Sequence, residues 1–434
     1  MGQSEKAVDF YDIQDAVAFN IPVDKDNPFY VDLTPYRSDF TENKIFKHLN
    51  IKPSTKECNP LRSVKKIFLS GYRGTGKTSE LLSLTKKIDD TKCYLTIFVD
   101  ISEEELDTSN IETVDILILM LKKLIGLLEE RGADISNESI TDFFDWYKSK
   151  IVEEVNKNVK GSAQIEVGIK VEDSLLGKLI GLVANTQAKL QGSKESKITI
   201  RREINNNFSM FSSKVNEFIL SLKSQLREKG HYQDILFILD GFEKIGSLED
   251  RKKILVDDAN KLSMIESHMI VTLPIELFTE KNRLSHFATN ENFPLIDLTK
   301  DGARECFREF ILKRVDEKLF EDGAVEKIIE FGAGHPRQTL QIINRSYIES
   351  EDEILTLESV DKSIELLAAE MSKVNDEEIE ILKKIAKKEL VSENDVYTKL
   401  KAKNIIFEYN NSFESTIINP IVAADGDFKK YLEQ

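Results

Sequence analysis

The sequence predicts an α/β fold in which a parallel sheet carries a phosphate-binding loop. Residues 71–78 match the pattern G-x-x-x-x-G-K-[ST], with an apolar run at 64–70 before them and a helical leucine repeat after them. A second apolar run, 234–239, ends in Asp240, and a third occupies 269–273. Buried parallel strands have this continuous apolar character, and ligands bind where such strands end. Together the three observations place a phosphate site at the carboxyl edge of the sheet.

The glycine loop is predicted to bind a nucleoside triphosphate. Its glycines let successive backbone N–H groups point at a phosphate, at the positive end of the helix that follows at 79–88. Lys77 is expected to reach the β- and γ-phosphates, and the Thr78 hydroxyl to bind Mg²⁺. An ordinary glycine-rich turn would not require this strand and this helix on its two sides. We expect nucleotide contacts from Gly71, Arg73, Gly74, Thr75, Gly76, Lys77, Thr78 and Ser79.

Composition limits the class of protein. A length of 434 residues allows two or three domains, and 41% hydrophobic residues supports buried cores. The net charge of −16 means that the molecule as a whole repels nucleic acid and anionic membranes, so nucleic acid is a disfavoured partner unless a local basic patch exists. No signal peptide is recognised, and the longest apolar run, 114–128, contains two lysines and is too short to span a bilayer, so a cytoplasmic protein is expected. Cys58, Cys93 and Cys306 are scattered and odd in number, which argues against a disulfide framework and a zinc site.

Residues 1–60 are predicted to form an N-terminal extension that drapes over the core of the protein. They are polar and contain Pro22, Pro28, Pro35, Pro53 and Pro60. Such a segment is better suited to crossing a surface than to folding alone. The stretch 27–33 either packs beside the nucleotide base or serves as a surface clasp, and the sequence favours neither.

The predicted core spans 61–300 and is interrupted by a mostly helical insertion at 103–232. A strand is expected at 93–101 before the insertion. Within it, 163–172 alternates apolar and polar residues, which is typical of a half-buried strand. Helices are expected at 114–130, 142–157, 174–190 and 194–229. The glycines of 174–190 indicate either close packing against a neighbouring helix or a contact surface for a subunit, a partner or a membrane.

The strand that ends in Asp240 is expected to deliver a carboxylate to the phosphate pocket. Asp240 would hold Mg²⁺, usually through water. Glu243, three residues further on, is placed to act as general base on the attacking water. The alternative for Glu243 is an acid in a surface turn.

Two further candidates follow the next strand, 269–274. Thr272 lies near its end and either bonds the γ-phosphate or the attacking water, or is simply a good strand residue. A helix is expected at 275–287, and a further short strand at 293–298. Arg283, near the end of that helix, either acts across a subunit boundary on a neighbour's γ-phosphate or is an ordinary exposed arginine.

Residues 301–372 are predicted to form a helical lid. Helices are expected at 301–315, 322–331 and 336–349. Pro336 suits the first turn of a helix, so Arg337 projects from a helix start. Arg337 there either touches the γ-phosphate and reports the nucleotide state or faces solvent. His335 has no second histidine near it, which argues against metal binding.

Residues 373–434 are predicted to form a winged-helix domain. Helices at 376–388 and 392–403, the second with a Ser392 cap, precede two short strands joined at Asn410 and Asn411. From 376 onward there are nine lysines, no arginine and twelve acidic residues. Arginine is the residue that reads guanine edges and grips phosphate in a bidentate manner, so this composition favours a protein contact over DNA reading.

Together these motifs resemble the AAA+/STAND class of P-loop NTPases. The resemblance lies in the glycine loop, residues 240–243, the strand end at 272–274, and residues 334–337, and it spans about 25–434. Within the class, the layout is similar to origin-recognition-like ATPases and to bacterial ATPases of defence and mobile-element loci. It implies a five-stranded sheet, with the strand of Thr272 between the glycine-loop strand and the Asp240 strand, followed by a lid and a winged helix.

The resemblance also implies roles and a function. By analogy Asp240 is the Mg²⁺ ligand, Glu243 the second acid, and Thr272 and Arg337 the two sensors. Gly241 stands where many AAA+ enzymes have glutamate, so slow hydrolysis is expected. The main expectation is a switch that uses ATP and Mg²⁺ to control homo-oligomer assembly or a protein partner, in bacterial antiviral defence. Two alternatives stay open, namely a DNA-binding initiator or transposition ATPase and a nucleotide-held scaffold without turnover.

Overall fold

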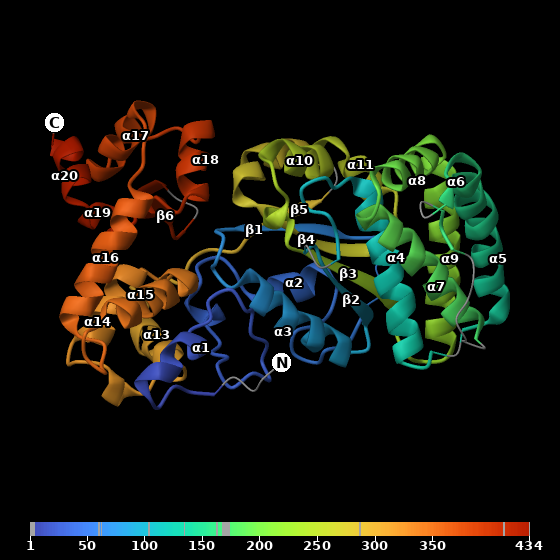
Figure 1. Ribbon diagram of the computed structural model, residues 1–434. Coiled ribbons are helices and arrows are strands. Elements are labelled where there is room, and N and C mark those ends of the chain that lie inside the picture. Colours follow the sequence, from blue (N-terminus) through green and yellow to red (C-terminus); the bar gives the residue numbers. More distant parts are fainter. Residues whose placement is uncertain are drawn as a thin grey trace.

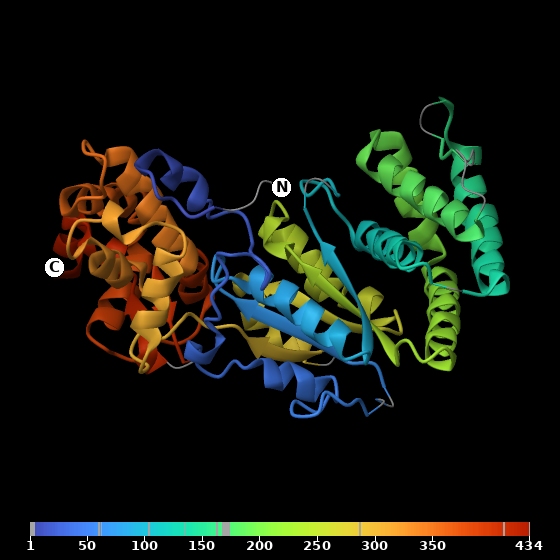
Figure 2. The same cartoon turned by 90° about the horizontal axis from the view of Figure 1, so that it is seen from below.

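The computed structural model has a central parallel sheet, a helical body built from the lid and C-terminal residues at one end, and the inserted helices at the other (Figures 1 and 2). The structure describes residues 5–59, 61, 63–102, 105–133, 135–161, 164–166, 174–285, 288–410 and 413–433. The five strands are β1 (Lys66–Gly71), β2 (Tyr94–Asp100), β3 (Asp234–Asp240), β4 (His268–Pro274) and β5 (Thr289–Asn292). Their order in the sheet is β2-β3-β4-β1-β5 and every pairing is parallel.

The parallel sheet with helices confirms the predicted α/β fold class. The register of its strands brings the predicted site residues to one edge of the sheet. Leu69 of β1 pairs with Thr272 of β4, and Leu239 of β3 pairs with Val271 of β4. The strand of Thr272 therefore lies between the other two, as predicted, and the ends of all three strands meet at one edge. Parallel strands covered on both faces bury nearly all their side chains, which explains the continuous apolar runs.

The strand predicted at 293–298 is wrong by four residues. The observed β5 (Thr289–Asn292) is made of polar residues and pairs with β1. Pro294 has no N–H to donate to a ladder, and Ile296 forms only an isolated bridge with Arg37. The apolar residues after β5 are buried without belonging to the sheet, so hydrophobicity alone misplaced the strand.

The N-terminal extension runs over the core and the lid. It contains the short helices α1 (Ile13–Ala16) and α2 (Glu42–His48). Ala7 N–H donates to the carbonyl oxygen of Arg314 at 2.8 Å, and Phe10 is buried in the apolar cluster of the lid. The extension is thus packed on the rest of the molecule along its described length.

Cys58 and Cys93 form a disulfide, which the argument against a disulfide framework did not anticipate. Cys58 pairs with Ile51 in an isolated bridge of the extension, and Cys93 directly precedes β2. The two Cα atoms lie 5.5 Å apart although 35 positions separate the residues. A contact between the extension and the start of a strand leaves no local pattern in the sequence. Cys306 is a free thiol.

The insertion forms a helical bundle beside β2. Its helices are α4 (Thr113–Glu130), α5 (Asn137–Tyr147), a π-helix (Lys148–Val152), α6 (Glu153–Asn158), α7 (Leu175–Gln191), α8 (Lys194–Asn206) and α9 (Phe208–Glu228). The single helix predicted at 194–229 is therefore two helices, which meet at Asn207. The glycine helix α7 packs against α4, although a side chain at Gly181 would meet nothing within 4 Å. Most of the strand predicted at 163–172 lies outside the described residues.

Short helices follow β3 and β4. After β3 come a 3₁₀-helix (Phe242–Lys244), α10 (Leu248–Lys252), a π-helix (Lys253–Asp257) and α11 (Ala259–Ser263). After β4 come a 3₁₀-helix (Ile275–Glu280) and α12 (Lys281–Leu284), where the sequence predicted one continuous helix. None of the helices in the described ranges is long and apolar enough to cross a membrane.

The rest of the chain is helical apart from one hairpin. Its elements are α13 (Ala303–Leu312), α14 (Ala324–Gly332), α15 (Pro336–Glu349), α16 (Leu357–Met371), α17 (Asp376–Ala386), α18 (Asp395–Ala402), β6 (Ile406–Glu408), β7 (Thr416–Ile418), α19 (Pro420–Ala424) and α20 (Gly426–Glu433). Strands β6 and β7 are antiparallel, as the predicted hairpin requires. The cap of α18 is Asn394 and not Ser392. Asn411 of the predicted turn lies outside the described residues.

Candidate nucleotide-binding site

The glycine loop joins the end of β1 to α3 (Lys77–Asp90). Gly74 and Gly76 have φ angles of 91° and 92°, which residues with a side chain rarely adopt. Between them Thr75 is fully buried, and its hydroxyl donates to the carbonyl oxygen of Tyr72 at 2.9 Å. The loop is therefore a fixed backbone structure at a helix start, which is the geometry that binds phosphate.

A buried arginine from the N-terminal extension supports this loop. Arg37 donates to the carbonyl oxygen of Thr75 at 2.7 Å and to that of Pro294, and its guanidinium lies 3.9 Å from the ring centre of Phe293. Burial lowers the pKa of Arg37 to about 10, so the group is still charged at neutral pH. Sequence reasoning missed Arg37, because its contact with Thr75 joins residues 38 positions apart.

Lys77 lies folded onto the loop that precedes it. Its Nζ donates to the carbonyl oxygens of Gly71 at 2.8 Å and Tyr72 at 2.7 Å. Burial lowers the pKa of Lys77, while the carboxylates of Glu243 and Asp240 oppose this shift. To reach a phosphate, the ammonium group must release the two loop carbonyls.

Thr78, Asp240 and Thr272 meet where their elements end. The Thr78 hydroxyl donates to Oδ2 of Asp240 at 2.6 Å. Asp240 is 1% exposed, and burial, together with the charge of Glu243, raises its pKa to about 6. The Thr272 hydroxyl is close enough to oppose that rise in pKa. Even so, the Thr272 hydroxyl has no hydrogen-bond partner of normal geometry within the described part of the chain. The same is true of Oδ1 of Asp240.

These oxygens fit a magnesium–nucleotide complex. Mg²⁺ takes oxygen ligands and commonly uses one or two protein groups together with water and substrate phosphates. Thr78 offers a hydroxyl, and Asp240 offers a carboxylate with one oxygen still available. When bound, the ion would neutralise charge on the phosphates. Thr78 and Asp240 are thus brought together as the sequence predicted.

Gly241 explains the departure from the usual pair of acids. Its φ is 96°, and a Cβ there would lie 2.7 Å from the carbonyl oxygen of Ile101 and 3.0 Å from Oδ1 of Asp100. No glutamate side chain fits directly after Asp240. The second acid of this turn is Glu243, which lies on the 3₁₀-helix and is half-buried.

Glu243 faces the other charged groups of the site. Its carboxylate favours the charged forms of Lys77 and Arg337 and raises the pKa of Asp240. These effects require proximity, because Coulomb interactions between partly exposed groups fade within about 10 Å. Glu243 thus belongs to the charged cluster of the site, and its role as general base stays a prediction.

The turn before α15 rests directly on the glycine loop. The Arg337 N–H donates to the carbonyl oxygen of Gly74 at 3.2 Å, and Nε2 of His335 lies 2.9 Å from that of Arg73. Nδ1 of His335 accepts from the Gln338 N–H, so Nε2 carries the hydrogen and donates to Arg73. Burial lowers the pKa of His335 to about 3, which keeps the ring neutral. The lid is therefore latched to the loop by two hydrogen bonds.

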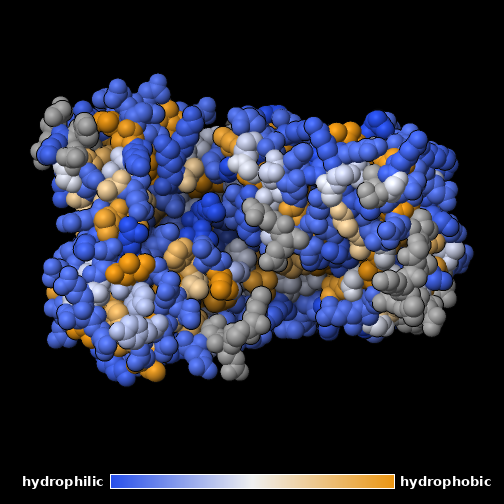
Figure 3. Space-filling model, viewed as in Figure 1, coloured by the Kyte–Doolittle hydropathy of each residue, from blue (hydrophilic) through white to orange (hydrophobic). Residues whose placement is uncertain are grey.

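Four cations gather at the loop: Arg73 and Lys77 belong to it, and Arg37 and Arg337 approach it from the extension and the lid. The Arg337 side chain is half-buried, and its Nε donates to the carbonyl oxygen of Phe19 at 3.4 Å, so it is not the solvent-facing arginine of the alternative prediction. Burial and the charge of Arg73 lower the pKa of Arg337. Such a concentration of positive charge suits a triphosphate. On the face seen in Figure 3, the surface is hollowed between the C-terminal helices and the core, and the residues there are mostly hydrophilic.

Two predicted site residues have other partners. The Ser79 hydroxyl accepts a hydrogen bond of 3.1 Å from the N–H of Val23, so it also holds the extension. Arg283 lies on α12, away from the loop, and pairs with Asp257 at 3.0 Å and Glu280 at 3.2 Å. Its side chain is 54% exposed. A role for Arg283 on a neighbouring subunit stays a prediction.

The C-terminal hairpin also reaches the glycine loop. Phe407 of β6 is fully buried, with its ring centre 5.8 Å from that of Tyr72 in an edge-on arrangement and 5.6 Å from that of His335 in a stacked one. The Glu408 N–H donates to the Tyr72 hydroxyl at 2.9 Å. Sequence reasoning missed this cluster, because Tyr72 occupies a variable position of the loop motif and its partners lie more than 260 residues away.

No protein-family model and no curated protein matches the sequence. Among solved structures, the Orc1 protein of Aeropyrum pernix in complex with DNA is 11% identical with a TM-score of 0.36, over 94% of this chain and 95% of that chain. Cdc6p from Pyrobaculum aerophilum is 12% identical with a TM-score of 0.35, over 95% of this chain and 99% of that chain. TM-scores of this size do not establish a common fold. The assignment of a nucleotide site comes from the loop, the strand order and the Thr78–Asp240 contact.

Proposed function

We propose that the chain is a switch in which Mg-ATP at the glycine loop sets the position of the C-terminal unit, residues 373–433. The observation that supports this most directly is the contact of Phe407 and Glu408 with Tyr72. Tyr72 belongs to the phosphate-binding loop, and the other two residues belong to the C-terminal hairpin. A change of loop structure on nucleotide binding therefore acts on the hairpin without an intermediate.

Lys77 connects phosphate binding to this contact. Its ammonium group is held by the carbonyls of Gly71 and Tyr72, and it leaves them when it turns to the phosphates. Tyr72 then loses one backbone partner while its side chain still carries the hairpin. Phosphate binding therefore changes the backbone contacts of the same residue whose side chain holds the hairpin, which is the kind of differential contact that a ligand-driven shift requires.

The lid and the C-terminal unit are joined so that they move together. Gln338 of α15 and Asn419 exchange two buried side-chain hydrogen bonds of 3.1 and 2.8 Å. The Tyr409 hydroxyl donates to the carbonyl oxygen of Ala333 at 2.7 Å. A γ-phosphate near Arg337 would displace the latch on Gly74 and carry this joined body with it.

The same residues are proposed to carry out ATP hydrolysis. Lys77, Thr272 and Arg337 are the proposed contacts of the γ-phosphate, and Thr78 and Asp240 are those of Mg²⁺. Glu243 is the proposed general base, and because it does not stand directly after Asp240, where Gly241 lies, we expect slow turnover. A scaffold without turnover is the alternative for this step. Homo-oligomer assembly, a protein partner and a role in antiviral defence stay predictions of the sequence resemblance.

DNA is a second candidate partner, favoured by one observation. Lys383 and Lys384 lie in the last turn of α17 and Lys387 and Lys388 directly follow the helix, and the last three of these lysines are exposed. Helix α18, which would be the reading helix of a winged helix, packs against the 3₁₀-helix Ile275–Glu280 of the core. Its Lys401 and Lys403 pair with Glu408 and Glu378. DNA reading would therefore require prior release of the C-terminal unit.

The test combines nucleotide binding with hydrogen exchange at the amide of Glu408. We expect Mg-ATP to bind wild-type protein and to accelerate exchange of this amide, because its acceptor is the Tyr72 hydroxyl. Saturation with Mg-ATP without a change at Glu408 would overturn the switch. Phosphate release that is lost in Glu243→Gln separates a hydrolysing switch from a scaffold.

Salt-dependent duplex binding separates the partner classes. A DNA partner requires duplex affinity that rises with ATP and falls steeply with salt, since each phosphate contact releases counterions. If no duplex binding is detected at low salt in the presence of ATP, DNA is excluded as the partner of the C-terminal unit. A protein is then the remaining candidate partner.

A further inference from the structure

The loop that leads from β2 into the insertion lies against the turn that carries Glu243. This loop, residues 105–112, meets the turn through a hydrogen bond of 3.1 Å from the Gly246 N–H to the carbonyl oxygen of Thr108. A Cβ at Gly246 would lie 3.7 Å from Cα of Ser109, so the two backbones are in contact. Glu243 precedes Gly246 by three residues, and the position of this loop therefore bears on the proposed general base.

Two inserted helices hold the start of the loop. Lys122 and Lys123 of α4 pair with the carboxylate of Glu105 at 3.0 and 2.7 Å. Gln187 of α7, which is 3% exposed, donates to the carbonyl oxygen of Glu105 at 2.6 Å. The start of the loop is thus attached to the inserted helices, ahead of the contact between Thr108 and Gly246.

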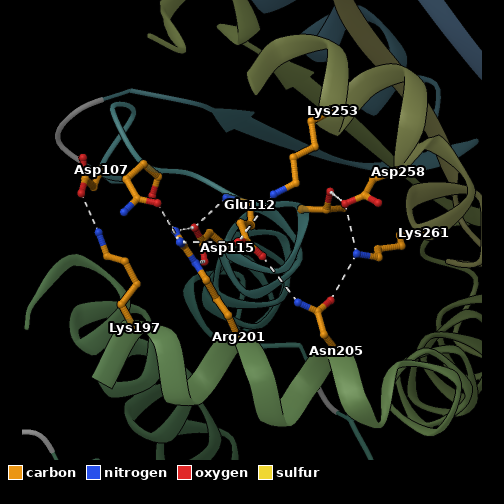
Figure 4. Close-up of polar contacts among 11 residues, drawn as sticks. Asp107, Glu112, Asp115, Lys197, Arg201, Asn205, Lys253, Asp258 and Lys261 are labelled. Atoms are coloured by element: carbon orange, nitrogen blue, oxygen red, sulfur yellow. Dashed lines mark hydrogen bonds and ion pairs between the residues drawn. The ribbon is translucent and has the colours of Figure 1, made fainter. Parts of the chain in front are cut away.

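A third helix, α8, holds the rest of the loop with two buried cations (Figure 4). Lys197 pairs with Asp107 at 2.5 Å. Arg201 donates to the side chain of Asn110 at 2.9 Å, to its carbonyl oxygen at 2.5 Å, and to both carboxylate oxygens of Asp115. Both cations are less than a tenth exposed. Asp115 is buried as well, so removal of Arg201 would leave the Asp115 carboxylate buried without its charged partner and is expected to disturb the loop.

The same face of α8 reaches the helices that follow the turn. Asn205 donates to Glu112 at 3.5 Å and accepts from Lys261 at 3.2 Å. Lys261 also bonds Asp258 at 3.0 Å, and Thr113 bonds that carboxylate at 3.2 Å. Figure 4 shows Lys197, Arg201 and Asn205 projecting from α8 toward these partners. The segment from Asp240 to α11 is therefore contacted from α8 both through the loop and through Asn205.

We propose that α8 positions the turn of Glu243 through residues 105–112, with Arg201 as the central positioning residue. The inserted helices then control phosphate release without touching the nucleotide, and a partner that displaces α8 changes the rate of hydrolysis. The role in hydrolysis rests on the proposed function. The positioning of the turn itself is a property of the nucleotide-free chain and is tested separately.

The experiment compares Arg201→Gln and Lys197→Met with two matched controls on α8, Arg202→Gln and Lys194→Met. Both control residues are exposed, unlike Arg201 and Lys197. We measure exchange of the Gly246 amide in the full chain by mass spectrometry with fragmentation, the affinity for Mg-ATP, and kcat for phosphate release. Lys197→Met keeps the Arg201 contacts and so provides a variant that folds if Arg201→Gln does not.

Arg201→Gln is expected to accelerate exchange of the Gly246 amide about tenfold and to lower kcat about tenfold, with ATP affinity within twofold of wild type. Lys197→Met is expected to change both in the same direction by less, and the controls by less than twofold. Unchanged Gly246 exchange in both variants, or equal changes in the controls, would overturn the proposal.

A second comparison separates positioning from general loss of stability. In the Glu243→Gln background, Arg201→Gln should cause no further fall in the residual rate of phosphate release, because its effect passes through Glu243. An equal tenfold fall in that background would overturn the role assigned to Arg201. If the wild type bound no ATP, the proposed function would fail, whereas faster exchange at Gly246 would still support the contact between α8 and the turn.

Discussion

The hydroxyl of Tyr72 accepts a hydrogen bond of 2.9 Å from the backbone N–H of Glu408, a residue 336 positions further along the chain. One residue is in the phosphate-binding loop and the other is in the C-terminal hairpin. Next to Glu408, Phe407 is fully buried and its ring packs edge-on against Tyr72. A phosphate site and the far end of the chain thus share a contact, and the predictions below test its consequences.

Replacing Lys77 by alanine should lower the affinity for Mg-ATP by tenfold or more, which corresponds to about 1.4 kcal/mol or above. The reason is the loss of the ammonium group that is expected at the β- and γ-phosphates. Isothermal titration calorimetry measures the change. Lys47→Ala, at an exposed lysine of α2, is the control and should bind as wild type. Equal affinity in Lys77→Ala would remove the glycine loop from the nucleotide site.

The Mg²⁺-dependent part of ATP affinity should weaken as pH falls through about 6, because the buried carboxyl of Asp240 titrates there in the folded protein. Its folded pKa lies above its usual value of 3.8, so this group makes the nucleotide-free fold more stable as pH falls from 6 toward 4. Mg²⁺ needs the ionised form, so affinity should drop about tenfold between pH 7.5 and 5. The same measurement on Asp240→Asn, which lacks the titrating carboxyl, gives the pH dependence of affinity that comes from ATP itself. A pH-independent difference between the two proteins would contradict this.

Gly241→Ala should destabilise the protein by about 1–3 kcal/mol. The substitution places a Cβ 2.7 Å from the Ile101 carbonyl oxygen in a backbone with φ of 96°. Gly126→Ala is the matched change in α4, where a side chain meets nothing within 4 Å, and should stabilise by about 0.5–1 kcal/mol. Denaturant titrations of both variants measure the difference. Similar effects at the two glycines would show that the turn after Asp240 tolerates a side chain.

Phe407→Ala should loosen the C-terminal unit and strengthen ATP binding, because the hairpin loses its buried ring contact with Tyr72. Burial of this ring implies a cost of about 3–5 kcal/mol for the contact. Phe428→Ala removes a ring of equal burial from the core of the same unit and does not touch the glycine loop. We expect limited proteolysis to increase in both variants, but ATP affinity to rise only in Phe407→Ala. If ATP affinity rises equally in both, the effect is general instability.

The sequence predicted the parts of the fold that depend on local pattern. The glycine loop follows an apolar run, Asp240 ends one and Thr272 lies near the end of one, and such runs, buried on both faces of the sheet, are recognisable one at a time. Their meeting at one edge follows from the parallel order of the strands. Helix α15 (Pro336–Glu349) was also predicted with its bounds, because Pro336 marks its first turn.

What the sequence did not show depends on contacts between distant residues. Arg37 supports Thr75 from the extension, Cys58 bonds Cys93, and Phe407 packs on Tyr72. In each pair the sequence around one residue contains no pattern that indicates its partner. Strand β5 was misplaced for a related reason. Its polar residues are held by pairing with β1, while the more apolar residues after it are buried outside the sheet.

The most direct test of the switch is the distance between the core and the C-terminal unit, measured by pulsed electron resonance. Spin labels at Glu249→Cys of α10 and Lys387→Cys, both exposed positions, report it in a Cys306→Ser background that retains the disulfide. We predict that saturating Mg-ATP shifts the distance distribution in the wild type, and that Lys77→Ala abolishes the shift. A distribution unchanged by Mg-ATP that is demonstrably bound would contradict the coupling of the glycine loop to the hairpin.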